Sequence, residues 1–235
     1  MAKATQVFNA QWLLRGYFDF KARERRDTLT RSVRDELARC LDVPADLIKI
    51  SSYPVGPNYR HTYWWRLGEI EYAEIQFFAR IAKEHAVLSL GVSIEKGLED
   101  AQALKGRPVT HRLNRKAWHW PHFLRHALYI LSTDLPKVQR KLDRPIFVRI
   151  LTKPSSQDAE RTFTMVNGRW YERHVGHTGP ATVIEHFRRL DTKPDLWVNA
   201  YIGIDLTSDE ADGLTAPKLV NIMLAFDPVR ERVRR

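Results

Sequence analysis

Basic, aromatic and histidine side chains alternate along one short stretch of the chain, residues 112–129. Arginine and lysine bind phosphate oxygens, histidine and tyrosine donate hydrogen bonds to them, and tryptophan rings stack on unpaired bases. The stretch therefore predicts contacts with nucleic acid. The candidate residues for phosphate contact and stacking are Arg112, Arg115, Lys116, Trp118, Trp120, His122, Arg125, His126 and Tyr129.

A helix is expected to present part of this set. Pro121 suits the first turn of a helix over residues 121–132. At 100° per residue, the apolar side chains of that helix, Leu124 and Leu128 included, form one arc that predicts contact with a core. The opposite face carries His122, Arg125, His126 and Tyr129. The alternative is that the two tryptophans anchor the core and the polar face is only solvated.

A second aromatic and basic cluster occupies residues 59–66. If this segment is a strand, Tyr63 and Trp65 share one face, and Arg60, Trp64 and Arg66 share the other. A tryptophan between two arginines is typical of surfaces that bind single strands or an extruded base. The alternative is a strand buried on both faces, with its arginines in salt bridges.

Two groups of residues are candidates for catalysis. Glu71 and Glu74 lie close together in the chain, and paired carboxylates hold magnesium or manganese in metal-dependent nucleases. Glutamates on an edge strand also serve to prevent aggregation, which is the alternative. His174 and His177 are three residues apart and suit metal binding or acid–base chemistry. A hydrogen-bonded loop pair is the ordinary interpretation of such histidines.

Several common catalytic motifs are absent from the sequence. There is neither a glycine-rich phosphate loop nor a Gly-x-Ser-x-Gly motif. The single cysteine, Cys40, excludes an intramolecular disulfide, and helical spacing places it on the apolar stripe of Leu29, Val33 and Leu37. A binding module is therefore favoured over an enzyme. No cofactor is expected, unless the nuclease alternative holds and requires magnesium or manganese.

The charge of the chain is concentrated. The 235 residues include 38 Lys and Arg against 28 Asp and Glu, a formal net charge of +10. Residues 105–149 hold 11 basic and 2 acidic side chains and thus account for most of the excess. Such a concentration predicts a polyanionic partner. Chance clustering of lysines and arginines on a solvated face is the alternative.

The elements that must position these residues are of mixed type. The pattern predicts an α+β fold, with an antiparallel meander over about residues 46–94 and a second group of strands over 146–204. Helices are expected near residues 22–41, 121–142 and 180–190, and the tail after Thr215 is also expected to be helical. Asn167-Gly168 predicts a two-residue hairpin turn.

Length and patterning predict one compact domain over residues 1–235, with a division near residue 145 as the alternative. The first thirty residues lack the apolar region of a secretory signal, and no apolar run is long enough to span a membrane. These features predict a cytoplasmic protein without a membrane partner. The sequence leaves the oligomeric state open.

These observations together predict a nucleic-acid-binding domain with a basic surface that contains tryptophan. Phosphates would contact residues 105–149, and bases would stack on Trp64, Trp118 or Trp120. The sequence does not choose between DNA and RNA, or between single and double strands. Two alternatives stay open, a small metal- or histidine-dependent nuclease on the same surface and an adaptor for an acidic protein partner.

Overall fold

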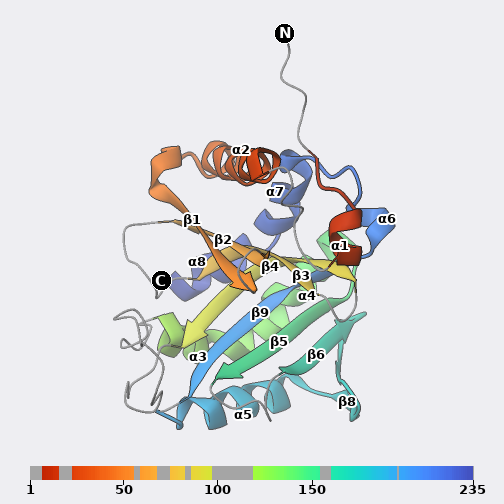
Figure 1. Ribbon diagram of the computed structural model, residues 1–235. Helices are drawn as coiled ribbons and strands as arrows, with labels where there is room; N and C mark the ends of the chain where they lie inside the picture. Colours follow the sequence, from red (N-terminus) through yellow and green to blue (C-terminus); the bar gives the residue numbers. More distant parts are fainter. Residues whose placement is uncertain are drawn as a thin grey trace, which may run out of the picture. The chain divides into compact units, whose positions relative to one another are not determined.

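The computed structural model has an α+β fold in which helices cover an antiparallel sheet (Figure 1). The structure describes residues 7–15, 23–55, 59–67, 75–82, 86–96, 119–153, 160–194 and 196–234. The strands are β1 (Ile48–Val55), β2 (Tyr59–Leu67), β3 (Gln76–Ala82), β4 (Val87–Lys96), β5 (Ile146–Lys153), β6 (Glu160–Val166), β7 (Arg169–Glu172), β8 (Gly176–Thr178) and β9 (Trp197–Leu206). Within the described residues, their order in the sheet is β1-β2-β3-β4-β9-β5-β6-β7-β8.

The helices vary from a single turn to five turns. They are α1 (Gln11–Arg15), α2 (Arg23–Leu41), α3 (His119–Tyr129), α4 (Leu135–Leu142), α5 (Pro180–Asp191), α6 (Ser208–Ala211), α7 (Ala216–Leu224) and α8 (Asp227–Arg234). A 3-10 turn (Ala45–Leu47) precedes β1, and a π-helical turn (Ile130–Asp134) joins α3 to α4. Among the helices of the described ranges, none combines the length and the apolar content that crossing a membrane requires.

The predicted α+β class is confirmed. The expected meander corresponds to β1–β4 and the second group of strands to β5–β9. The helices expected near residues 22–41, 121–142 and 180–190 are α2, the α3–α4 pair and α5, and the tail forms α7 and α8. Strand β9 lies between β4 and β5 in the sheet, a position that local sequence spacing does not reveal.

The chain divides into two compact units. Unit 1 comprises Met1–Glu69, Gln76–Gly91 and Ile204–Leu224, and unit 2 comprises Ile70–Ile75, Val92–Gly203 and Ala225–Arg235. Both units draw on segments that are far apart in the sequence. Pro145 lies inside unit 2 and not at its edge.

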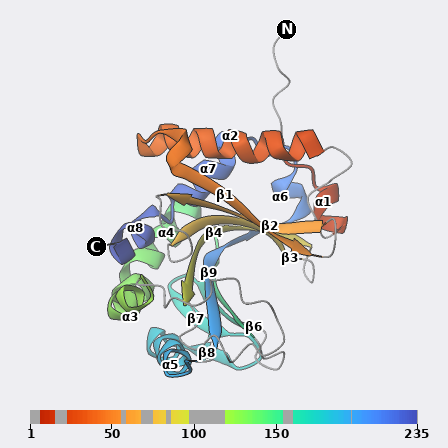
Figure 2. The ribbon, with the colours of Figure 1, turned by 60° about the vertical axis from the view of Figure 1, so that its left-hand side comes forward.

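The core of unit 1 lies between its strands and two helices. Figure 2 shows α2 and α7 over the same face of β1–β4, and these two helices pack against each other. Leu29, Val33 and Leu37 of α2 are buried, as their spacing predicts. The expected burial of Cys40 is wrong, because this residue is exposed in the last turn of α2. Its place on the stripe does not bury it, since burial also requires a neighbouring element over that turn.

The core of unit 2 lies between β9, β5 and β6 and the helices α3, α4 and α5 (Figures 1 and 2). Ile146, Val148 and Ile150 of β5 alternate toward this core and are at most 1 % exposed. Gln139 of α4 fastens the β6–β7 hairpin to the helix. Its amide nitrogen donates to the carbonyl of Met165 (3.1 Å), and its amide oxygen accepts from the backbone N–H of Gly168 (2.9 Å).

Candidate nucleic-acid interface

Strand β2 separates its aromatic residues onto two faces. Tyr63 and Trp65 are 2 % and 3 % exposed, and the indole N–H of Trp65 donates to the carbonyl of Thr30 in α2 (3.1 Å). Trp64 lies on the opposite face and is only partly buried. The predicted alternation of the strand is therefore confirmed for these three residues. Trp64 remains a candidate for stacking, whereas Trp65 belongs to the core.

Antiparallel register places cations beside Trp64. Lys49 on β1 lies directly opposite Arg66 on β2, and Ser51 lies opposite Trp64. On the other side of β2, Arg80 of β3 pairs with Thr62. We call Lys49, Ser51, Trp64, Arg66 and Arg80 the Trp64 surface. It occupies the face of β1–β3 turned away from the core of unit 1.

The accessible part of the Trp64 surface lies toward β1, the end strand of the sheet. Lys49 is exposed, and Trp64, Arg66 and Arg80 are partly exposed. Phe78, opposite Trp64 on β3, is fully buried. The indole N–H of Trp64 is buried and is therefore not available to a ligand. The exposed part of Trp64 lies next to the cations of Lys49 and Arg66.

Several of the predicted contact residues cannot be placed. In the 59–66 cluster, the side chain of Arg60 lies outside the described residues. In the 112–129 cluster, Arg112, Arg115, Lys116 and Trp118 lie outside them. Trp120 lies in the core of unit 2 and not on a surface. It is 0 % exposed, its indole N–H donates to Asp191 (3.0 Å), and its ring contacts those of Phe123 and Phe187. We therefore exclude Trp120 from the proposed interface.

Helix α3 keeps the predicted polar face, but its neighbours occupy much of that face. Arg125 is exposed, and His122 and His126 are partly buried. The guanidinium of Arg232 in α8 lies 3.8 Å from the centre of the Tyr129 ring and also binds the carboxylate of Asp134. The Tyr129 ring therefore already has a cationic neighbour. Of the four predicted residues on this face, Arg125 is the one best placed for a ligand.

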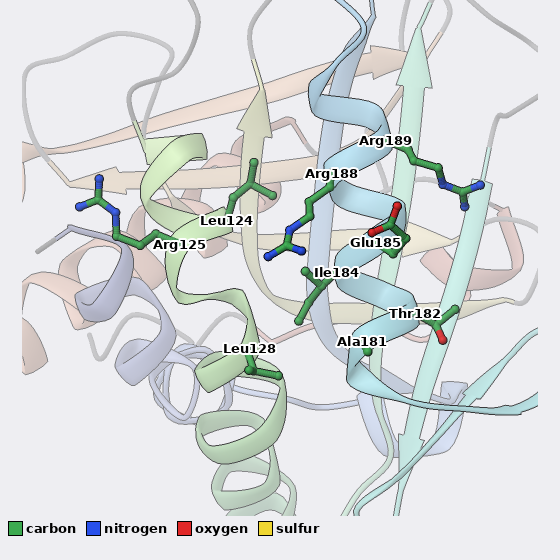
Figure 3. Close-up of a pocket in the computed structure, with 9 residues that line it drawn as sticks. All are labelled: Leu124, Arg125, Leu128, Ala181, Thr182, Ile184, Glu185, Arg188 and Arg189. Atoms are coloured by element: carbon green, nitrogen blue, oxygen red, sulfur yellow. The ribbon is translucent and has the colours of Figure 1, made fainter.

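The apolar arc of α3 is not fully covered. Phe123 and Ala127 are 0 % exposed as expected, but Leu128 is 60 % exposed. The expectation that Leu128 contacts the core is wrong, because the arc is wider than the part that α5 and the sheet cover. This leucine lies in a groove between α3 and α5 (Figure 3).

The groove has a volume of about 690 Å³ and combines an apolar floor with charged walls. Figure 3 shows Leu124, Leu128 and Ile184 turned toward the space between the helices, with Arg188 extended across it. Arg125 and Arg189 point outward on opposite sides. Arg188 and Arg189 were not among the residues predicted from the sequence. Their position on the polar face of the predicted 180–190 helix was the available signal.

The candidate catalytic residues do not form a site in the described residues. Glu71 and Glu74 lie outside those residues. His174 is exposed in the turn between β7 and β8. His177 is exposed on β8, and its ring packs edge-on against that of Tyr171 on β7, with 5.7 Å between the ring centres. Within the described ranges, no group of three or more His, Cys, Asp and Glu side chains is arranged to hold a metal ion.

A polar cluster near these histidines has its own internal partners. Arg161 donates to the carboxylate of Glu172 (2.5 Å) and to Nδ1 of His186 (2.9 Å). Because a guanidinium only donates hydrogen bonds, Nδ1 of His186 must be the acceptor and Nε2 must carry the proton. Glu172 and His186, the potential third ligands for a metal at His174 and His177, are thus held by Arg161.

Comparison with known proteins gives no relative from which a function could be transferred. No known protein family, no curated protein and no solved structure matches this chain.

Proposed function

We propose that this protein binds nucleic acid through the Trp64 surface, with an unpaired base stacked on Trp64 and phosphates bound by the adjacent cations. The single observation that carries the proposal is the position of Trp64, partly exposed beside Lys49 and Arg66 while the neighbouring Trp65 is buried. Stacking on an aromatic ring accepts any base, since every base has a flat aromatic face.

Electrostatics supports the same assignment. Lys49 and Arg66 are cross-strand neighbours, so both cations belong to the same face of the sheet. A phosphate bound there would form charge-assisted hydrogen bonds with these side chains. The net charge of +10 adds a long-range attraction for any polyanion. Because stacking requires an exposed base, we expect preference for single strands over duplexes.

The salt dependence of binding tests the proposal. Labelled single- and double-stranded DNA and RNA are titrated with the protein by fluorescence anisotropy over a series of salt concentrations. The double variant Lys49→Ala with Arg66→Ala should bind single strands more weakly. The slope of log K against log salt should fall by about 1.4, since each lost phosphate contact on a single strand contributes about 0.7.

The matched control removes two exposed cations from the opposite side of unit 1. Arg31 lies on α2 and Lys218 on α7, and both are exposed. The variant Arg31→Ala with Lys218→Ala has the same net charge as the test variant and should keep the wild-type slope. Equal loss of slope in both variants, or absence of binding by the wild type at low salt, would contradict the proposal.

A further inference from the structure

We infer that the groove between α3 and α5 is a docking site for an acidic, amphipathic helix of a protein partner. This inference is independent of the proposed function, because it concerns residues of unit 2 alone. It starts from the 60 % exposure of Leu128, which is large for a leucine on the apolar arc of a helix. Exposed apolar side chains that line a groove with a polar rim are typical of protein interaction sites.

The floor of the groove offers aliphatic contacts. Leu124 and Leu128 of α3 face Ile184 of α5, and Ala181 lies at the end of the groove nearer the N-terminus of α5 (Figure 3). None of the residues described as lining it is aromatic. A base would therefore find no ring to stack on, whereas leucine or isoleucine side chains of a helix would find a complementary surface. The floor thus favours a peptide over a nucleic acid.

The charged residues around the floor of the groove indicate that the partner carries negative charge. Three arginines and one glutamate line the groove, namely Arg125, Arg188, Arg189 and Glu185. Within the described residues, the guanidinium groups of Arg125 and Arg188 make neither a hydrogen bond nor an ion pair. Carboxylates on both flanks of a partner would pair with these arginines, and the long-range attraction would increase the association rate.

The dimensions of the walls suit a helix of about three turns. Helices α3 and α5 contain 11 and 12 residues, so each is about 17 Å long. A third helix placed between two packed helices can insert side chains at i, i+3, i+4 and i+7 into the groove. We therefore expect a segment with leucine or a similar residue at these positions and with Asp or Glu on both sides of the apolar stripe.

The test uses a labelled synthetic peptide of about 14 residues with leucine at helical spacing and glutamate elsewhere. A second peptide has the same composition in scrambled order, so that the apolar stripe is lost. Fluorescence anisotropy should show saturable binding of the first peptide and at least about tenfold weaker binding of the second. Equal binding of the two peptides, or no binding of the first, would overturn the inference.

Two pairs of variants locate the binding site. Leu128→Glu and Arg188→Glu should each weaken binding by about tenfold or more. The matched controls are Val175→Glu, at an apolar side chain that is 70 % exposed, and Arg140→Glu, at an exposed arginine of α4. Both controls should bind the peptide like the wild type. Equal weakening by the controls would show that net charge alone attracts the peptide and would overturn the inference.

A competition experiment separates this site from the Trp64 surface. The variant Lys49→Ala with Arg66→Ala should bind the acidic peptide with unchanged affinity, even if it no longer binds oligonucleotides. A single-stranded oligonucleotide should not displace the peptide from the wild type. If Arg188→Glu weakens oligonucleotide binding and leaves peptide binding unchanged, the groove is a nucleic-acid site and the docking inference is overturned.

Discussion

Tryptophan residues in this protein occupy environments that predict opposite effects of mutation. Trp120 is 0 % exposed, packs against Phe123 and Phe187, and donates a hydrogen bond to Asp191. We predict that Trp120→Ala lowers the free energy of unfolding by about 3–5 kcal/mol, because it leaves a large cavity and removes the hydrogen bond to Asp191. Urea unfolding followed by circular dichroism measures this loss. A loss below about 1 kcal/mol would show that the ring is not a core anchor.

His119, one residue earlier in the chain, is expected to make stability depend on pH. Burial lowers its pKa to about 4, and the positive charge of Arg234 acts in the same direction, whereas the neighbouring backbone of Val233 opposes them. The unfolded chain takes up the proton near pH 6.5, but the folded chain does so only near pH 4. The contribution of the neutral His119 imidazole to folding stability is therefore fully present above pH 6.5, and it is lost as the pH falls toward 4.

The predicted loss between these pH values is at most about 3 kcal/mol. It is measured as the free energy of unfolding at several pH values for the wild type and His119→Leu. The curve of the variant should be flatter over this interval, whereas that of His177→Ala, at an exposed histidine, should follow the wild type. Parallel curves for the wild type and His119→Leu would show that this imidazole does not control the acid sensitivity.

At the scale of elements, the β6–β7 hairpin depends on its turn. Asn167 and Gly168 have φ values of 50° and 73°, so both lie in the left-handed region that the Asn-Gly pair predicts. A Cβ at Gly168 would meet no atom within 4 Å, so a substitution there is penalised by the backbone conformation and not by a clash. We predict that Gly168→Val costs about 1–2 kcal/mol and that Gly168→Asn costs less. Equal losses in thermal unfolding would contradict this explanation.

The spacing of apolar residues along the sequence explains why most helices and strands could be predicted. Alternation in β2 correctly assigns Trp65 to the core and Trp64 to the other face, and the stripe of Leu29, Val33 and Leu37 correctly gives the buried side of α2. Some residues at positions that suit a core are nevertheless exposed, because no neighbouring helix or strand covers that part of the apolar face. Cys40 and Leu128 lie at positions that suit a core, yet both are exposed. Periodicity shows which face is apolar but not how far a partner covers it.

Features that depend on contacts between distant segments could not be predicted from the sequence. The position of β9 between β4 and β5 and the discontinuous composition of both units depend on pairings between distant segments. The groove likewise requires α3 and α5 to pack together, although 50 residues separate them in the sequence. The basic character of the chain could be predicted, but which arginines lack an ion partner depends on these tertiary contacts.

For the whole molecule, the central claim is that the Trp64 surface binds unpaired nucleic acid. The most direct measurement is the affinity of the intact protein for a labelled single-stranded oligonucleotide, compared among the wild type, Trp64→Ala and Trp64→Phe. The control is Tyr171→Ala, which removes an exposed ring from unit 2. Melting temperatures of all four proteins verify that the fold is retained.

We predict that Trp64→Ala weakens binding by about 5- to 150-fold, the equivalent of about 1–3 kcal/mol for one stacked base, with little change in melting temperature. Trp64→Phe should retain part of the affinity, because a smaller ring still stacks, and Tyr171→Ala should bind like the wild type. Unchanged affinity in a folded Trp64→Ala variant would contradict the claim that this surface binds nucleic acid.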